Sequence, residues 1–309
     1  LVIGSVIAGL LLYQQAKPTF SSPPACQGAE EYVGFFLAIE KDSYKMKKLF
    51  LGALMAVTAV TSPLLMAKSN DKNDQEVINI YFARHGKTLL NSFDRVQGWI
   101  DSPLTKDGVQ VAQYLGEGLK GIKFDRFYSS DAGRQRETMA VILKQAGVTD
   151  YHLTEMTGLR EAFFGGFEGG YNVDMANAGA HALGMSDSKA LFKAMKAGTL
   201  SVSESQNALA KSDPKQLAEN YEQVKERTQA ALATIVENAQ KEGGKNILAI
   251  SSGTAIQIMI SDLTDDPAKN LPLSNAAVVK ITYHDGKYSV PEIGTMKYVE
   301  AGKVSLNHK

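Results

Sequence analysis

From residue 77 onward, the pattern of hydrophobic and polar positions predicts short strands that alternate with helices. A short apolar run rich in β-formers indicates a buried strand at 77–83, and three further segments read as strands, at 124–129, 151–155 and 246–251. Apolar residues at helical spacing predict helices, at 105–120, 133–145 and 254–263. This alternation predicts an α/β fold: a three-layer, mostly parallel sheet with helices on both faces.

Local signals mark several of these boundaries. Thr105 is a candidate N-cap for the first helix, and Gly147 is placed to end the second. Near the end of the chain, Asp285-Gly286 lies between two apolar runs, a pair typical of tight hairpin turns. We therefore expect a β-hairpin over 277–291.

A long stretch, 171–244, separates the third predicted strand from the fourth, and its pattern is mostly helical. We predict that 171–219 forms a helical cap insertion over the site, since insertions of this size on α/β scaffolds often do so. Pro214 is expected to open the helix that runs through 222–227.

The first 76 residues differ in composition from the rest. Residues 1–45 are treated as an N-terminal extension, which read-through from upstream would explain, and no function is assigned to them. Residues 46–68 begin with Met46 and two lysines, continue in an apolar run and end in polar residues, the layout of a signal peptide or N-terminal anchor. A buried helix of a cytosolic domain is the alternative. Residues 69–76 read as a linker, and 77–309 as the folded domain of a secreted or envelope-anchored bacterial protein.

Charge and composition exclude several classes of function. The 33 basic and 33 acidic side chains cancel, so no global charge attracts nucleic acid. Cys26 is the only cysteine, and the five histidines show no metal-ligand spacing. We therefore expect no metal, no other cofactor and no nucleic-acid partner. Anion binding must come from a local group of arginines.

Such a group is predicted where the strands end. Arg84-His85-Gly86 follows the first strand directly, and loops at the carboxyl ends of strands form the ligand crevice in open α/β sheets. A guanidinium grips phosphate oxygens, and a neutral imidazole can attack phosphorus. The tripeptide alone is a weak signal. The prediction rests on the further blocks that follow it in order, which contain Asn91, Arg134, Glu161 and Ser252-Gly253-Thr254.

This series resembles the histidine phosphatase superfamily, namely the phosphoglycerate mutase-like enzymes of its first branch, over 77–294. The resemblance implies that His85 is transiently phosphorylated and that Arg84 and Arg134 hold the phosphate. It also implies that Glu161 donates a proton to the departing oxygen and that Asn91 lies near the substrate. We add Ser252, Gly253 and Thr254 as substrate-binding residues. For Glu161 the alternatives are a structural ion pair with an arginine, or replacement in the acid role by Glu168.

One position departs from the family pattern. The fourth block of the family reads Ser-His-Gly, and its histidine completes the phosphate cage, whereas this chain has Ser252 there. A serine hydroxyl donates one hydrogen bond and carries no charge. Losing a charge-assisted contact costs about 1.5–3 kcal/mol, so we expect slower transfer, by roughly tenfold to several hundredfold.

The sequence favours an exported phosphomonoester hydrolase acting on a phosphorylated small molecule through phosphohistidine at His85. A catalytically weak relative that binds phosphorylated or other anionic ligands is the alternative, motivated by Ser252. A phosphoglycerate mutase is a second alternative, disfavoured because its substrates are intracellular. The substrate and the oligomeric state stay open.

Overall fold

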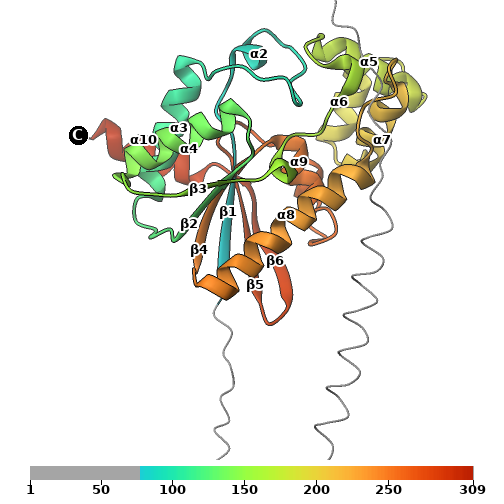
Figure 1. Cartoon of the computed structure of the whole chain (residues 1–309). Coiled ribbons are helices and arrows are strands. Elements are labelled where there is room, and N and C mark those ends of the chain that lie inside the picture. Colours follow the sequence, from blue (N-terminus) through green and yellow to red (C-terminus); the bar gives the residue numbers. More distant parts are fainter. Residues whose placement is uncertain (1–76, 309) are drawn as a thin grey trace, which may run out of the picture. The chain divides into compact units, whose positions relative to one another are not determined.

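A six-stranded mixed sheet forms the centre of the folded domain (Figure 1). The structure is a computed structural model and describes residues 77–308. The strands are β1 (Ile78–Arg84), β2 (Arg126–Ser129), β3 (Leu153–Glu155), β4 (Asn246–Ser251), β5 (Val278–His284) and β6 (Lys287–Thr295). Their order is β3-β2-β4-β1-β5-β6. The first four strands are parallel to one another, β5 pairs antiparallel with β1, and β6 pairs antiparallel with β5. The predicted mostly parallel α/β fold is confirmed.

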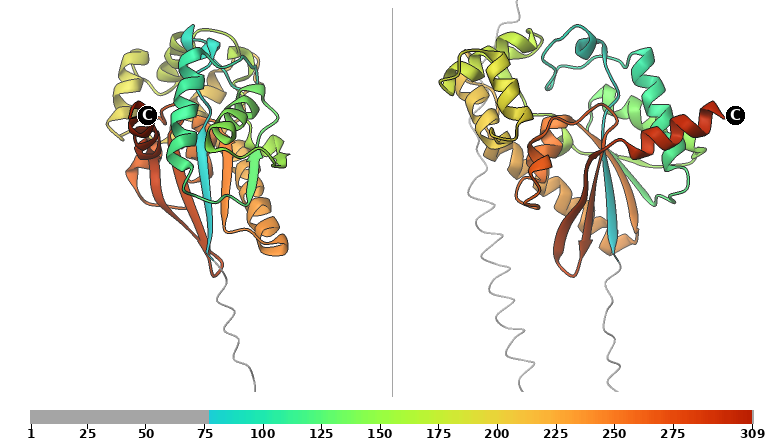
Figure 2. Two further views of the ribbon diagram at one scale, coloured as in Figure 1. Left: turned by 90° about the vertical axis from the view of Figure 1, so that its left-hand side faces the viewer. Right: turned by 180° about the vertical axis from the view of Figure 1, so that it is seen from behind.

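Helices cover both faces of this sheet (Figure 2). The helices are α2 (Leu89–Ser92), α3 (Lys106–Leu119), α4 (Gly133–Ala146), α5 (Asn172–Ala182), α6 (Ser188–Lys196), α7 (Val202–Ser212), α8 (Tyr221–Glu242), α9 (Gly253–Met259) and α10 (Lys297–Asn307). Buried residues of α8 and α9 pack on one face, and those of α3, α4 and α10 pack on the other. The sheet is therefore the middle of three layers.

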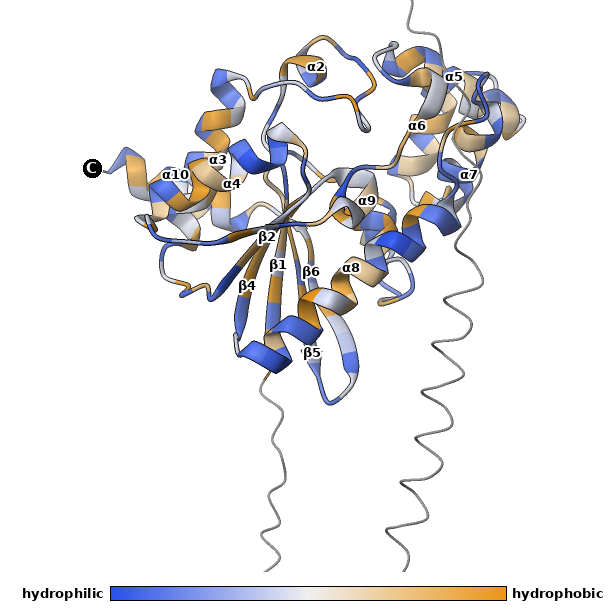
Figure 3. Cartoon of the chain, in the orientation of Figure 1, coloured by the Kyte–Doolittle hydropathy of each residue, from blue (hydrophilic) through white to orange (hydrophobic). Residues whose placement is uncertain are grey.

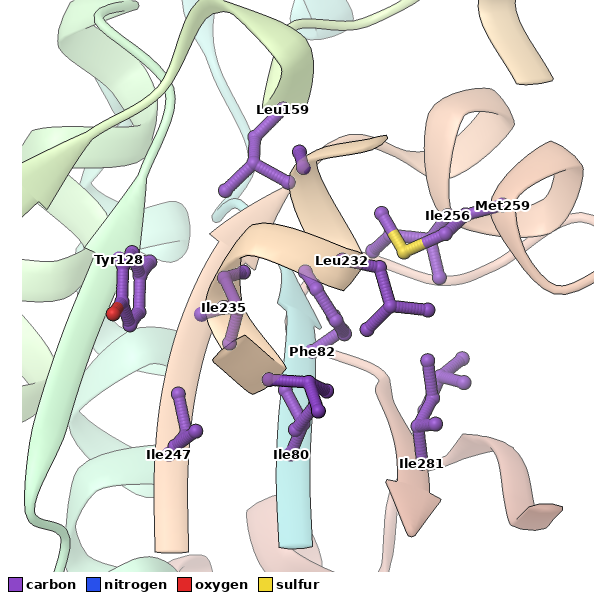
Figure 4. Close-up of a cluster of buried hydrophobic side chains, with 14 of the residues drawn as sticks. Ile80, Phe82, Tyr128, Leu159, Leu232, Ile235, Ile247, Ile256, Met259 and Ile281 are labelled. Carbon is purple, nitrogen blue, oxygen red and sulfur yellow. The ribbon is translucent and has the colours of Figure 1, made fainter. Parts of the chain in front are cut away.

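Successive side chains of β1 point to opposite faces of the sheet and pack in two different clusters. Ile80 and Phe82 pack with Leu232 and Ile235 of α8 (Figure 4), whereas Tyr81 packs in the opposite cluster. Because both faces are covered, residues 80–83 of β1 form a continuous buried apolar run. Hydropathy mapped on the ribbon follows this arrangement, with hydrophobic colour gathered along the central strands and both colours along α8 (Figure 3). Burying these side chains supplies most of the stabilisation of the domain.

The predicted local signals have the expected structures. Thr105 is the N-cap of α3, and its side chain accepts a hydrogen bond from the Gly108 N–H at 3.0 Å. Gly147 ends α4 in the left-handed conformation. Asp285 and Gly286 both have positive φ, as a two-residue hairpin turn requires, and they join β5 to β6.

Residues 171–219 contain three helices, α5, α6 and α7, with small buried clusters of their own. The expectation that Pro214 opens the following helix is wrong. The Asp213 carboxylate instead accepts hydrogen bonds from four backbone N–H groups and holds 213–218 in a turn. Helix α8 begins at Tyr221, where Asn220 and Gln223 form a capping box.

The expected signal segment and the extension before it lie outside the described residues. Within residues 77–308, no helix combines the length and the hydropathy needed to cross a membrane.

Candidate active site

The Arg84-His85-Gly86 segment leaves the sheet at the carboxyl end of β1. Arg84 pairs with Ser251 of β4, so the chain segments that follow β1 and β4 leave the sheet side by side. The His85 N–H donates to the Ser251 carbonyl oxygen at 3.1 Å, and the Asn275 side chain donates to the His85 carbonyl oxygen at 2.9 Å. The turn is thus fixed from β4 and from the loop before β5.

Gly86 is needed here for close backbone approach. Its φ is not positive, but a Cβ at this position would lie 2.6 Å from the Gly108 carbonyl oxygen. Its N–H donates to the Thr138 hydroxyl at 3.0 Å. The glycine lets the turn after β1 lie against α3 and α4, which keeps His85 at the sheet edge.

The His85 ring is buried and is held by one hydrogen bond to the backbone. Its Nδ1 lies 2.8 Å from the Gly86 carbonyl oxygen, which can only accept, so Nδ1 carries the proton and Nε2 keeps its lone pair. Burial lowers the pKa of His85 well below its ordinary value, and the charges of Arg134 and Arg84 lower it further. The imidazole is therefore neutral at neutral pH.

We predict that free His85 stays neutral when the pH is lowered through 6.5, because protonation would place a third buried cation beside two guanidinium groups. Histidine-selective NMR, with His85→Gln to assign the signal, follows this titration without interference from the phosphate of a substrate. Protonation of His85 at or above pH 6.5 would contradict the prediction.

Two buried guanidinium groups flank this imidazole, each with an unused donor. Arg84 donates from Nη1 to the Leu273 carbonyl oxygen at 2.5 Å, and Arg134 is only 1% exposed. Both Nε atoms are buried without a hydrogen-bond partner in the described part of the chain. Burial lowers the pKa of Arg84, and the Glu161 charge opposes that effect. Because unpaired buried donors cost free energy, this pair is suited to an incoming anion.

Arg134 also fixes the loop before α3. Its Nη1 donates to the Ile100 carbonyl oxygen at 3.2 Å and pairs with Asp101 at 2.9 Å, and its Nη2 donates to the Gly98 carbonyl oxygen at 2.7 Å. Arg134 is fully buried although it lies in the first turn of α4. The side chain is rigid because its other donors are occupied.

Ser252 lies at the N-cap of α9, fully buried. Its hydroxyl oxygen accepts from Gln135 Nε2 at 3.0 Å and lies 3.5 Å from Arg134 Nη2. It makes no capping hydrogen bond to α9. With its lone pairs facing two donors, the hydroxyl is free to donate its own proton to an anion.

Glu161 is held beside the start of α9. Its carboxylate accepts from the Ala255 N–H at 2.8 Å, the Thr254 N–H at 3.2 Å and the Ala162 N–H at 2.9 Å. It forms no ion pair with an arginine among the described residues, so the structural alternative considered for it does not hold. Arg227 of α8 donates to the Glu161 carbonyl oxygen at 2.8 Å and so positions this segment.

The other two polar candidates are engaged elsewhere. Glu168 accepts from the backbone N–H groups of Gly98, Trp99 and Ile100 and so holds that loop, whereas the charge of Glu161 acts on Arg84. Asn91 accepts from the Thr88 N–H at 3.3 Å in the capping box of α2. Its amide is half-buried and holds this turn.

The structure brings Arg84, His85, Arg134, Glu161 and Ser252 to one edge of the sheet. Three supporting residues were not predicted from the sequence: Gln135, Asn275 and Arg227. Gln135 donates to the Ser252 hydroxyl, and the other two donate to the backbone carbonyl oxygens of His85 and Glu161. None of the three carries a local sequence signal, because the burial of Gln135 in α4 becomes visible only in the structure. No group of three or more metal-ligating side chains occurs within residues 77–308.

Comparison with known proteins identifies the family of the chain. The model of the histidine phosphatase superfamily (branch 1) matches residues 80–190 and 189–295. A crystal structure of phosphoglycerate mutase from Bacillus anthracis is 40% identical, with a TM-score of 0.70, over 74% of this chain and 98% of that one. The probable phosphoglycerate mutase GpmB of Salmonella arizonae is 27% identical over 215 residues, which are 69% of this chain and 88% of that relative. YhfR of Bacillus stearothermophilus shares the fold, with 24% identity and a TM-score of 0.56 over 72% of this chain and 99% of its own. The chain therefore belongs to branch 1 of the histidine phosphatase superfamily.

Proposed function

We propose that this protein hydrolyses phosphomonoesters through a phosphohistidine at His85. One observation carries the proposal: a neutral imidazole with a free Nε2 lone pair lies beside two buried guanidinium groups whose Nε donors have no partner within residues 77–308. A phosphoryl group carries about two negative charges, and its transfer depends mainly on positioning and charge stabilisation. The two arginines supply both.

The proposed reaction has two steps. His85 Nε2 attacks phosphorus, a P–N bond forms, and the ester P–O bond breaks with its electron pair passing to the ester oxygen. Glu161 in its acid form gives that oxygen a proton, and the alcohol leaves. Glu161, now a carboxylate, takes a proton from water, whose oxygen attacks phosphorus. The P–N bond breaks, its electron pair returns to Nε2, and phosphate leaves.

Ser252 fits this scheme as a hydrogen-bond donor to the phosphoryl group. We expect Ser252→Ala to lower kcat/KM by roughly tenfold to a hundredfold, because a hydrogen bond to a charged group is lost. Ser251→Ala is the matched control, since that neighbouring buried hydroxyl is already committed to the Leu159 carbonyl oxygen at 2.8 Å. Equal kinetics in the wild type and Ser252→Ala would rule out this role for Ser252.

A mutase reaction is the second candidate, favoured by the 40% identical solved structure described as a phosphoglycerate mutase. The test supplies phenyl phosphate in one assay, and 3-phosphoglycerate with its bisphosphate primer in another. Release of inorganic phosphate from phenyl phosphate supports the hydrolase. Isomerisation of phosphoglycerate without phosphate release supports the mutase.

A catalytically weak anion-binding protein is the third, motivated by Ser252. If the native chain binds phosphate but releases none from any ester, and Ser252→His gains hydrolysis, this alternative replaces the hydrolase. Turnover by the native chain that His85→Ala stops removes it.

We also propose that the protein is exported, on the strength of the signal-like pattern of 46–68. Expression of the full chain in a bacterium, followed by fractionation, tests this. The intact chain in the cytosolic fraction alone would refute it.

A further inference from the structure

A cavity of about 430 Å³ adjoins the candidate active site on the side of the helical insertion. Arg84 and Thr254 form part of its wall. Arg84 is the phosphate-binding arginine next to His85, and the Thr254 N–H contacts the carboxylate of Glu161. The cavity therefore begins where the ester oxygen of a bound phosphomonoester would lie.

The remaining wall is predominantly apolar. Phe164 comes from the segment after Glu161, whereas Met175, Leu191 and Leu209 come from α5, α6 and α7. Phe192 of α6 also lines the cavity and is 51% exposed, so an apolar surface meets solvent there. A volume of this size is in the range of small-molecule sites.

Within residues 77–308, the wall offers no second cation to bind another anionic group, and its other polar side chains, Asn172, Ser205, Gln206 and Gln257, are neutral. Among the described residues that line the cavity, Arg84 is the only cation and Asp94 the only carboxylate. Arg84 is committed to the phosphoryl group, and Asp94 would repel a carboxylate of the substrate. A buried carboxylate without a partner is strongly disfavoured.

We infer that the preferred substrates are phosphomonoesters of uncharged, apolar alcohols, whose organic group occupies this cavity. The inference rests on the proposed function in that it places the phosphoryl group at His85. It assigns a substrate class that a phosphorylated sugar acid does not fit.

The test measures binding of non-hydrolysable phosphonates, so it does not depend on turnover. n-Hexylphosphonate and ethylphosphonate carry the same head group and differ by four methylenes. We expect the hexyl compound to bind at least about tenfold more tightly by calorimetry, because buried methylenes favour binding. We expect 2-carboxyethylphosphonate to bind no more tightly than ethylphosphonate.

A pair of variants locates the effect. Phe192→Ser is expected to weaken hexylphosphonate binding about threefold to tenfold and to leave ethylphosphonate unchanged. Leu217→Ser is the matched control, because Leu217 is 60% exposed in the same insertion and does not line the cavity.

Two results would overturn the inference: equal affinity for the two alkyl phosphonates, or tighter binding of the carboxyethyl compound. Hydrolysis of n-hexyl phosphate is measured separately. A protein that selects hexylphosphonate but releases no phosphate from any ester keeps the inferred binding preference and loses the proposed hydrolase activity.

Discussion

Replacing His85 with alanine is expected to lower kcat for phosphomonoester hydrolysis by at least about 10⁴-fold, because the attacking nitrogen is removed. The two arginines would still bind the ester, so KM should change far less than kcat. Steady-state kinetics with n-hexyl phosphate measure both constants. The buried ring makes one side-chain hydrogen bond, to Gly86, so the variant is expected to fold.

His181→Ala is the control for this experiment. His181 is an exposed histidine of α5, and its loss should leave kcat unchanged. Circular dichroism of both variants checks the fold. Retention of more than about a hundredth of the wild-type kcat in folded His85→Ala would mean that another group attacks phosphorus.

Replacing Glu161 with glutamine is expected to lower kcat/KM for an alkyl phosphate by about 10²- to 10⁴-fold, because kcat/KM reports the steps up to the departure of the alcohol. An alkoxide is a poor leaving group without a proton, and an amide cannot supply one. p-Nitrophenyl phosphate has a leaving group that needs little protonation, so the same variant should lose much less kcat/KM toward it, although kcat falls for both esters because water also loses its base. The ratio of the two losses reports proton donation separately from any structural damage.

Glu168→Gln is the matched control. Glu168 holds the backbone N–H groups of 98–100, so its replacement should lower stability and affect both esters to a similar extent. Equal losses of kcat/KM for the two esters in Glu161→Gln would show that Glu161 is not the proton donor.

The sheet and the nucleophile could be predicted from the sequence because their signals are local. Strands β1 and β4 are short, mostly apolar runs, and His85 follows β1 directly. Once the strands are parallel, their carboxyl ends must meet at one edge, which brings Arg134 and Ser252 near His85 although they are distant in sequence. The family pattern added roles to these positions.

What the sequence could not predict depends on contacts between distant segments. Proline favours the first turn of a helix, so Pro214 suggests a helix start. The Asp213 carboxylate instead accepts hydrogen bonds from the Gly166 N–H and from three N–H groups within 215–218, and this network forms a turn. Gln135 acquires its role only because Ser252 packs against it. The helical pattern of the insertion likewise gives no sign that Phe192 lies half exposed at a cavity.

The phosphorylated intermediate is the most direct test of the proposed mechanism. The protein is mixed with a labelled phosphomonoester, quenched within milliseconds in base and digested, and the peptides are sequenced by mass spectrometry. We predict an acid-labile, base-stable phosphate on the peptide that contains His85, which disappears when unlabelled ester is added before the quench. Turnover with no phosphate on His85, or with phosphate on another residue, would contradict the mechanism.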